Sequence, residues 1–437
     1  MSMNKSLAST ARKAFHQSLR KAFSFFPRSL RFAIFRSFAD CDPSPDARLV
    51  LKIAETQEEL EACFKLLHDA YVESGFMKPD PSGMRVTIYH ALPTTTTLCA
   101  KFDGEVVGTL SLIRESVFGF PLQAIFDLSK VRAQKGKIAE VSALAVHPKF
   151  RKTGGAILFP LMKFMYEYCT TFFDTRHLVI AVNPNRIEMY ESLLFFQRLT
   201  ENDVQNYDFA NGAPAVGASL DLREARGQLK RAYGRKKARK NLYAYFTKLK
   251  LPNIVIPGRR YYTTNDPVMT PELLDYFFNQ RTKVFNKLGS NEKALLYSIY
   301  NLPEYAQYLP AGIADSDPAK GARQHTRYSF KCSGIFDVEL GEERDSIQIN
   351  VVDCSLHGFL AHSRNPLPTQ VWGTAVIRLG PNEHSRVRAL AVGAKKDVGF
   401  YGFKLAEPDL VWRKFVAALE AGTTHDDMDN ATRFLVD

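Results

Sequence analysis

The sequence lacks the features that mark membrane-spanning, metal-binding and disulfide-stabilised proteins. Its 437 residues contain no apolar run near the roughly 18 residues that a membrane-spanning helix needs. The six cysteines, at positions 41, 63, 99, 169, 332 and 354, form no C-x-x-C pair and have no histidines grouped near them. This pattern excludes a zinc site or a disulfide framework and indicates reduced thiols. Nucleic acid is not an expected partner, because no helix-turn-helix, zinc-finger or aromatic RNA-binding motif is present.

Positive charge is the strongest compositional feature. The chain has 58 Lys and Arg against 46 Asp and Glu, a net charge of +12, which favours nucleotides, an acidic carrier protein or a membrane surface as partners. Residues 1–39 alone contain eight Lys and Arg and no acidic residue, with Phe and Leu at helical spacing. Three interpretations fit this segment: a disordered or core-docked tail, a surface that adsorbs to an anionic membrane or docks an acidic protein, and an organellar transit peptide.

Hydrophobic periodicity in residues 46–225 predicts a mixed α/β domain. A strand in 48–56 leads to a helix with Thr56 as its N-cap, and a hairpin turns at Asp103-Gly104. The pattern continues with a strand (137–148), a helix (about 154–170), a strand (177–183), a helix (186–196) and a strand (213–222). This order builds a sheet covered by helices.

Short strands dominate the C-terminal quarter. A basic helix (223–250) and further helices lead to the Gly-, Pro- and Asp-containing stretch 311–322, which predicts a domain boundary near 315. Six strands (326–340, 345–353, 357–362, 371–379, 386–394 and 398–405) and a closing helix predict a small β-barrel. We therefore divide the chain into a basic segment (1–45), a mixed α/β domain (46–225), a helical connector (226–315), a barrel (316–422) and a tail (423–437).

A candidate anion cradle lies between the strand at 137–148 and the next helix, in Arg151-Lys152-Thr153-Gly154-Gly155-Ala156. Glycines allow a tight turn there, and the N–H groups at the start of a helix point at an anion. Two cations add charge to the same turn. A Gly-Gly pair before a helix often forms only a turn, so the surrounding sequence must decide whether this one binds an anion.

That context resembles the GNAT superfamily of acyltransferases, whose motif is Arg/Gln-x-x-Gly-x-Gly/Ala. Arg151, Gly154 and Ala156 match it, and "VNPNRIEMYESLLF" (182–195) is similar to the segment that follows it in these enzymes. With "MRVTIYHALPTTTT" (84–97), the spacing is most similar to FeeM-type N-acyl amino acid synthases and, more distantly, to acyl-homoserine lactone synthases. The resemblance covers roughly residues 47–225 and implies a GNAT fold that binds an acyl donor.

The resemblance also implies roles for individual residues. The donor's phosphopantetheine is expected at Val146, Arg151, Lys152, Thr153, Gly154, Gly155, Ala156 and Asn183. Glu140 is the candidate general base for an acceptor amine, and Tyr190 the candidate acid for the leaving thiolate. Arg85 is a candidate contact for an acceptor carboxylate. The alternatives are a salt bridge for Glu140, core packing for Tyr190 and a helix cap for Asn183.

The same resemblance implies the substrates. FeeM-like enzymes take long acyl chains from acyl carrier protein, an acidic partner that suits a basic chain, while acyl-CoA would use the same cradle. The acceptor would be an amino acid or a similar amine, and no metal is implied.

A second motif is split across the predicted barrel. Arg323 and Arg327 form Arg-x-x-x-Arg before its first strand, and Asp353-x-Ser355-x-x-Gly358 follows the second. Together they resemble the signature of PilZ domains, six-stranded barrels that bind cyclic di-GMP. The arginines would bond phosphate and stack on guanine, and Asp353, Ser355 and Gly358 would receive the base edge and a phosphate. A barrel that only mediates contacts is the alternative.

These interpretations combine into a bacterial, cytoplasmic N-acyltransferase regulated by cyclic di-GMP. A receptor for a bacterial messenger makes the transit-peptide interpretation of residues 1–39 unattractive, and leaves peripheral contact with the inner membrane as an alternative location. Two other hypotheses remain: an inactive GNAT domain in an effector that binds membrane or proteins, and an acetyl-CoA-dependent acetyltransferase.

Overall fold

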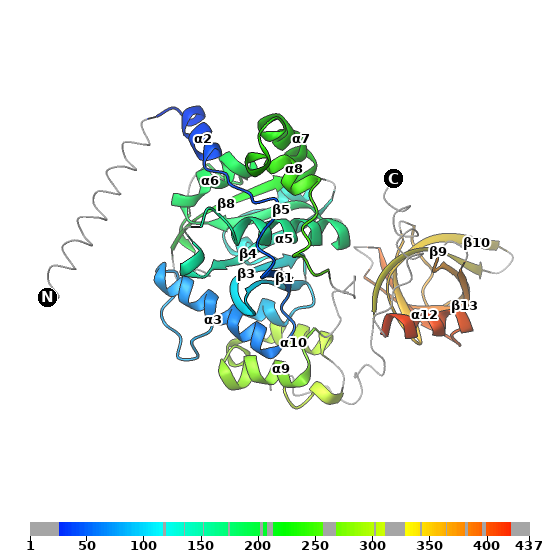
Figure 1. Cartoon of the computed structure of the whole chain (residues 1–437). Helices are drawn as coiled ribbons and strands as arrows, with labels where there is room; N and C mark the ends of the chain where they lie inside the picture. The colour runs from blue at the N-terminus through cyan, green and yellow to red at the C-terminus, as the bar shows by residue number, and fades with distance from the viewer. Residues whose placement is uncertain are drawn as a thin grey trace.

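The computed structural model describes two folded bodies (Figure 1). The described residues are 26–116, 119–134, 136–151, 153–173, 175–201, 204–207, 213–256, 268–300, 303–310, 328–340, 343–363, 365–380, 383–395 and 399–420. Every helix in these ranges is too short or too polar to cross a membrane.

An eight-stranded mixed sheet forms the centre of the first body. Its order is β1-β2-β3-β4-β5-β8-β6, with β7 paired to β8. Only β4 and β5 run parallel; the other pairs are antiparallel. The bounds are β1 Leu49–Ile53, β2 Thr95–Phe102, β3 Glu105–Arg114, β4 Lys137–Val146, β5 Thr175–Val182, β6 Gln197–Arg198, β7 Val204–Tyr207 and β8 Ala213–Asp221.

Two helices cover opposite faces of this sheet, because alternate strand residues point to opposite sides. Leu98 of β2 belongs to a core with α5 (Leu158–Phe173), whereas the next residue, Cys99, packs with α3 (Gln57–Glu73). Thr56 caps α3 as predicted, accepting a hydrogen bond from the Glu59 N–H, and the predicted hairpin turns at Asp103 and Gly104. Two shorter helices are α4 (Ser129–Arg132) and α6 (Pro184–Leu194).

The predicted single helix at 223–250 is wrong. The segment forms α7 (Leu222–Tyr233) and α8 (Leu242–Thr247), because Asn241 starts a new helix by accepting a hydrogen bond from the Ala244 N–H at 2.9 Å. The predicted connector then packs on the first body: the Val255 N–H donates to the Leu51 carbonyl, and α9 (Pro271–Asp275), a π-helix (Tyr276–Arg281) and α10 (Ser290–Ile299) share a core with α3. Figure 1 shows α7 and α8 at the end of this body opposite α9 and α10.

Helix α2 (Arg28–Ser37) docks on α6. Arg28 and Arg31 form ion pairs with Glu191 and Glu188 at 2.8 and 2.6 Å, and the Arg36 Nε donates to the Ser192 carbonyl. Residues 28–37 therefore dock on the first body through their arginines, although none of them is fully buried. Residues 1–25, which carry much of the basic pattern, lie outside the described residues.

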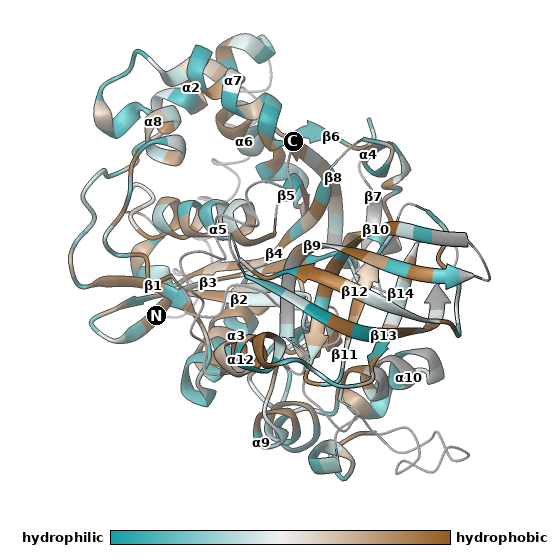
Figure 2. Cartoon of the chain, turned by 90° about the vertical axis from the view of Figure 1, so that its right-hand side faces the viewer, coloured by the Kyte–Doolittle hydropathy of each residue, from teal (hydrophilic) through white to brown (hydrophobic). Residues whose placement is uncertain are grey.

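The second body is a closed ring of six antiparallel strands, in the order β10-β11-β14-β13-β12-β9. Polar and apolar residues alternate along its strands (Figure 2), as expected when one face lines a core. The bounds are β9 Tyr328–Leu340, β10 Glu343–Ser355, β11 Gly358–His362, β12 Trp372–Arg378, β13 His384–Lys395 and β14 Phe400–Leu405, followed by α12 (Leu410–Glu420). The six predicted strands and the final helix are confirmed, with ends shifted by a few residues.

Candidate functional site

The sheet of the first body opens between β4 and β5. The last pair in their parallel ladder is Glu140 with Val179; beyond it β4 pairs only with β3, and β5 only with β8. A β-bulge follows immediately, where Ala143 adopts a positive φ of 54°. A bulge redirects a strand and releases backbone groups from the ladder. The opening therefore begins next to Glu140.

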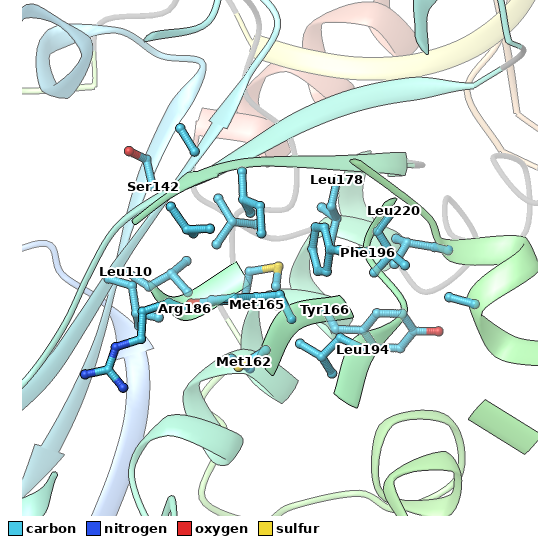
Figure 3. A pocket seen from close by; sticks show the side chains of 18 of the residues that line it. Leu110, Ser142, Met162, Met165, Tyr166, Leu178, Arg186, Leu194, Phe196 and Leu220 are labelled. Carbon is cyan, nitrogen blue, oxygen red and sulfur yellow. The ribbon is translucent and has the colours of Figure 1, made fainter. Parts of the chain in front are cut away.

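An apolar cavity of about 270 Å³ occupies this opening. Its walls come from both strands, through Ser142 and Leu144 of β4 and Ile180 and Val182 of β5, and from Met162 and Met165 of α5. It also reaches Tyr71 and Phe76 at the end of α3, Tyr190 of α6, and α7 and α8. Figure 3 shows Ser142 and Leu110 on one side of the cavity and Tyr166, Leu194 and Leu220 on the other.

Glu140 is buried and does not itself line this cavity, although the next residues of β4, Val141 and Ser142, do. It is 2% exposed, and its carboxylate accepts a hydrogen bond from the Leu122 N–H at 3.0 Å. Burial raises the pKa of Glu140 to about 8, although the bonds from Leu122 and from the Ser142 side chain oppose the shift. Glu140 has no ion pair among the described residues, which argues against its salt-bridge interpretation. Ser142, which lines the cavity, links the carboxyl group to it.

The raised pKa of Glu140 predicts a stability effect with a definite sign. The native state binds this proton more tightly than the unfolded chain, so its contribution to the free energy of unfolding is full below the ordinary pKa of 4.5 and is lost as the pH rises to about 8. Glutamine does not titrate, so the free energy of unfolding of Glu140→Gln does not fall in this way as the pH rises. We expect its melting temperature to exceed that of wild type by several degrees at pH 8, and the difference to shrink at pH 5.

Glu59→Gln is the matched control. Burial opposes ionisation of Glu59, but hydrogen bonds from Lys101 and Lys52 outweigh it and lower the pKa to about 2. Its charged form therefore stabilises the fold throughout pH 5–8, and Glu59→Gln should melt below wild type at both pH values. A Glu140→Gln protein that also melts below wild type at pH 8 would contradict the raised pKa.

The structure brings Tyr190, Tyr71 and Arg85 to the same region. Tyr190 lines the cavity, and burial raises the pKa of its hydroxyl, so it is protonated at neutral pH. The Arg85 guanidinium lies 4.2 Å from the centre of the Tyr71 ring, and Tyr71 lines the cavity. Tyr71 and Tyr190 therefore line the cavity, whereas Arg85 contacts Tyr71 without lining the cavity itself.

The predicted anion cradle is a turn before α5. Gly154 and Gly155 have φ angles of 67° and 92°, so α5 begins at Leu158 rather than near 154. A Cβ on Gly155 would lie 2.5 Å from the Phe159 ring, so this position requires glycine. The Arg151 Nε donates to the Val146 carbonyl, and its guanidinium pairs with Glu73. Lys152 lies outside the described residues.

The other cradle residues have visible structural roles. Thr153 donates its hydroxyl hydrogen to the Phe150 carbonyl, and the Asn183 side chain caps α6 by accepting from the Asn185 N–H. The cap interpretation of Asn183 thus describes its carboxamide oxygen, while its contact with a donor stays a prediction. The predicted contacts of Val146, Thr153 and Ala156 with the acyl donor also stay predictions.

Sequence reasoning missed several neighbours of the site. Asp40 lies against Gly154 and accepts a hydrogen bond from Arg239 at 2.9 Å, which lowers the pKa of the aspartate. The motif at 151–156 gives no sign of two partners so distant in the chain. Ser142 and the cavity residues of α7 and α8 were missed for the same reason.

Part of the second motif lies at the β10–β11 turn of the barrel. Asp353 and Ser355 are buried, and the Ser355 hydroxyl donates to the Gly358 carbonyl at 3.3 Å. The Trp412 indole donates to the Ser355 carbonyl, and a Cβ on Gly358 would lie 2.5 Å from the Phe403 carbonyl oxygen. Gly358 is therefore required by barrel packing. Arg323 and Arg327 lie outside the described residues.

Comparison with known proteins concerns the first body. Residues 62–221 match the family model "N-acyl amino acid synthase FeeM". The structure of FeeM, an N-acyl amino acid synthase from uncultured soil microbes, is 27% identical over 41% of this chain and 94% of that one, with a TM-score of 0.35. The CoA-dependent acyl-homoserine lactone synthase BjaI is 20% identical over 43% and 91%, with a TM-score of 0.33. An acyl-CoA N-acyltransferase from Pseudomonas aeruginosa is 16% identical over 39% and 97%, with a TM-score of 0.27. No curated protein sequence matches the chain.

The family match supports the prediction that the chain is an N-acyltransferase. The matched residues include strands β2 to β8 of the sheet, the opening between β4 and β5 and the cradle. They end before α7 and before the barrel, so the PilZ interpretation stays a prediction.

Proposed function

We propose that the chain transfers a long acyl chain from a phosphopantetheine thioester to the amine of an amino acid or a similar acceptor. The observation that carries this proposal is the apolar cavity of about 270 Å³, whose β4 wall starts directly after Glu140 and most of whose lining lies in the region matched to N-acyl amino acid synthases. An acetyl group would leave most of such a cavity empty. The cavity thus favours a long acyl donor over acetyl-CoA.

The reaction needs a base, an acid and a site for the developing oxyanion. In this proposal, the amine nitrogen attacks the thioester carbonyl and loses its proton to Glu140, directly or through a water molecule. The bulge residues Ala143 and Leu144 line the cavity and have no partner in the β3–β4 register, and we propose that their backbone N–H groups stabilise the oxyanion. When the C–S bond breaks, Tyr190 protonates the thiolate. In the same proposal, Arg85 binds an acceptor carboxylate.

Direct assay tests the proposal. Purified full-length protein is incubated with acyl thioesters of different lengths and a set of amino acids, and mass spectrometry is used to detect N-acyl amides. Lipid extracts from cells that overproduce the protein should contain the same species. Protein that binds acyl thioesters but forms no amide under any of these conditions would favour the inactive-effector hypothesis.

We further propose acyl carrier protein as the donor, because the net charge of +12 suits an acidic protein. Attraction between two charged proteins is screened by salt, whereas the attraction for a small, uncharged thioester is not. Transfer from the carrier should fall roughly tenfold between low salt and 0.5 M salt. Transfer from a short acyl-pantetheine should change little. Equal salt responses would favour a CoA-type donor.

The barrel is proposed to bind cyclic di-GMP and to regulate the transfer. The two halves of the motif, and the position of Asp353, Ser355 and Gly358 at one turn of a six-stranded ring, support this proposal. Turnover measured with and without the nucleotide tests the coupling, and identical rates would refute it. Membrane contact through residues 1–39 is a separate proposal, supported by the exposed side chains of Phe26, Leu30 and Phe38.

A further inference from the structure

The far wall of the apolar cavity comes from helices that follow the family-matched region. The match ends at residue 221, and α7 begins at Leu222. Leu222, Ala225 and Leu229 of α7 and Phe246 and Thr247 of α8 all line the cavity. These helices therefore belong to the site, although the sequence pattern assigned most of them to a connector.

Helix α7 is fixed at both ends. Asp221 caps it by accepting from the Arg223 N–H at 2.8 Å and is itself held by an ion pair with Arg176. At the other end, Tyr233 is fully buried and donates its hydroxyl hydrogen to the Leu193 carbonyl. A wall that is capped and packed in this way holds a fixed position.

Helix α8 is fixed against α5. The rings of Tyr245 and Phe159 meet edge to face at 6.4 Å, and Leu242 is fully buried in the same core. Phe246 is buried as well and faces both this core and the cavity. Removing the Phe246 ring would therefore extend the cavity rather than open a new one elsewhere.

The two sides of the cavity would contact different parts of an acyl donor. Ser142, hydrogen-bonded to Glu140, lies on the side where the proposed chemistry occurs, and Leu220, which precedes α7, lies on the other (Figure 3). An acyl chain with its thioester near Glu140 would point its methyl end at α7 and α8. We infer that α7 and α8 set the maximum length of the acyl chain, with Ala225 and Phe246 as the determining residues.

The volume of the cavity indicates how long an acyl chain it can hold. A dry protein cavity of about 150 Å³ holds the six carbons of benzene. By the same ratio, about 270 Å³ holds roughly ten carbon atoms. Each buried methylene strengthens binding roughly fourfold until the wall is reached, after which an added methylene must displace protein atoms.

The test uses saturated acyl-pantetheine thioesters of six to sixteen carbons with the full-length protein. This inference rests on the proposed function, so binding of the matching fatty acids is measured by calorimetry alongside kcat/KM. Wild type should show an optimum near ten carbons. Ala225→Leu should shorten the optimum by two or more carbons and lower kcat/KM for the longest chains at least tenfold. Phe246→Ala should lengthen the optimum by a similar amount.

Leu242→Ala is the matched control, because Leu242 is buried in α8 but does not line the cavity. It should destabilise α8 while leaving the length profile in place. If wild type transfers acyl chains and all four proteins share one profile, the inference is wrong while the proposed function stands. If no thioester is transferred, the proposed function fails, and the fatty-acid binding profiles alone decide the inference. A shift in Leu242→Ala equal to that in Phe246→Ala would also overturn it.

Discussion

Replacement of Glu140 by Gln should lower kcat/KM for acyl transfer by a factor of about 10² to 10⁴, the usual contribution of a general base. The amide retains the size and the hydrogen-bonding capacity of the side chain but cannot accept the proton of the amine. Donor binding should change little, because Glu140 lies outside the cradle. The measurement is initial rate against donor and acceptor concentration, with N-acyl product quantified by mass spectrometry.

The pH dependence makes this prediction specific to Glu140. With a pKa near 8, only about a tenth of the side chain is ionised at pH 7, so the ratio of kcat/KM of wild type to that of Glu140→Gln should rise nearly tenfold per pH unit below pH 7 and level off above pH 8. In Glu140→Gln, the remaining pH dependence should be that of the acceptor amine alone. Glu59→Gln, another buried glutamate changed in the same way, should stay within a few-fold of wild type. An unchanged rate and pH profile in Glu140→Gln would remove Glu140 from the mechanism.

Replacement of Arg327 by Ala should weaken cyclic di-GMP binding at least 100-fold, to below detection by calorimetry at micromolar protein. A guanidinium that bonds a phosphate bidentately and stacks on a base contributes several charge-assisted hydrogen bonds, each worth about 1.5 to 3 kcal/mol. Arg323→Ala should have a similar effect. The measurement is titration of the full-length protein with the nucleotide.

Arg386→Ala is the matched control, since Arg386 is exposed on β13 and its loss changes the net charge by the same amount. It should bind the nucleotide as wild type does. Equal affinities of wild type and Arg327→Ala would show that the PilZ interpretation is wrong. Equal losses in Arg327→Ala and Arg386→Ala would indicate a non-specific charge effect.

Local patterns were enough to predict most strands and helices of both bodies. The cap at Thr56 and the turn at Asp103-Gly104 depend on residues within a few positions of each other, so the sequence displays them directly. The turn before α5 was predicted in the same way, because Gly154 and Gly155 are needed where the backbone adopts a positive φ, whereas anion binding at this turn stays a prediction. The location of Glu140 followed from its place in the strand before the cradle.

Long-range packing was the part that the sequence did not reveal. Residues 223–250 read as one solvated basic helix, because their charges dominate the local pattern, yet Leu229 and Phe246 are buried against the cavity. The pKa shift at Glu140 was also hidden, since it depends on burial in the folded chain and on a hydrogen bond from Leu122 in another element. For the barrel, Gly358 was predicted to admit a ligand, whereas the structure gives it a packing role against Phe403.

The docking of α2 on α6 limits how far the protein can be truncated from its N-terminus. A truncation at residue 46, the boundary suggested by composition, would leave Glu188 without its arginine and would remove Asp40 from between Gly154 and Arg239. Helix α6 carries Tyr190, so the loss would reach a residue of the proposed chemistry. The smallest fragment expected to keep the native site runs from residue 26 to residue 310, and a purification tag is better placed before residue 1 than in place of the N-terminal segment.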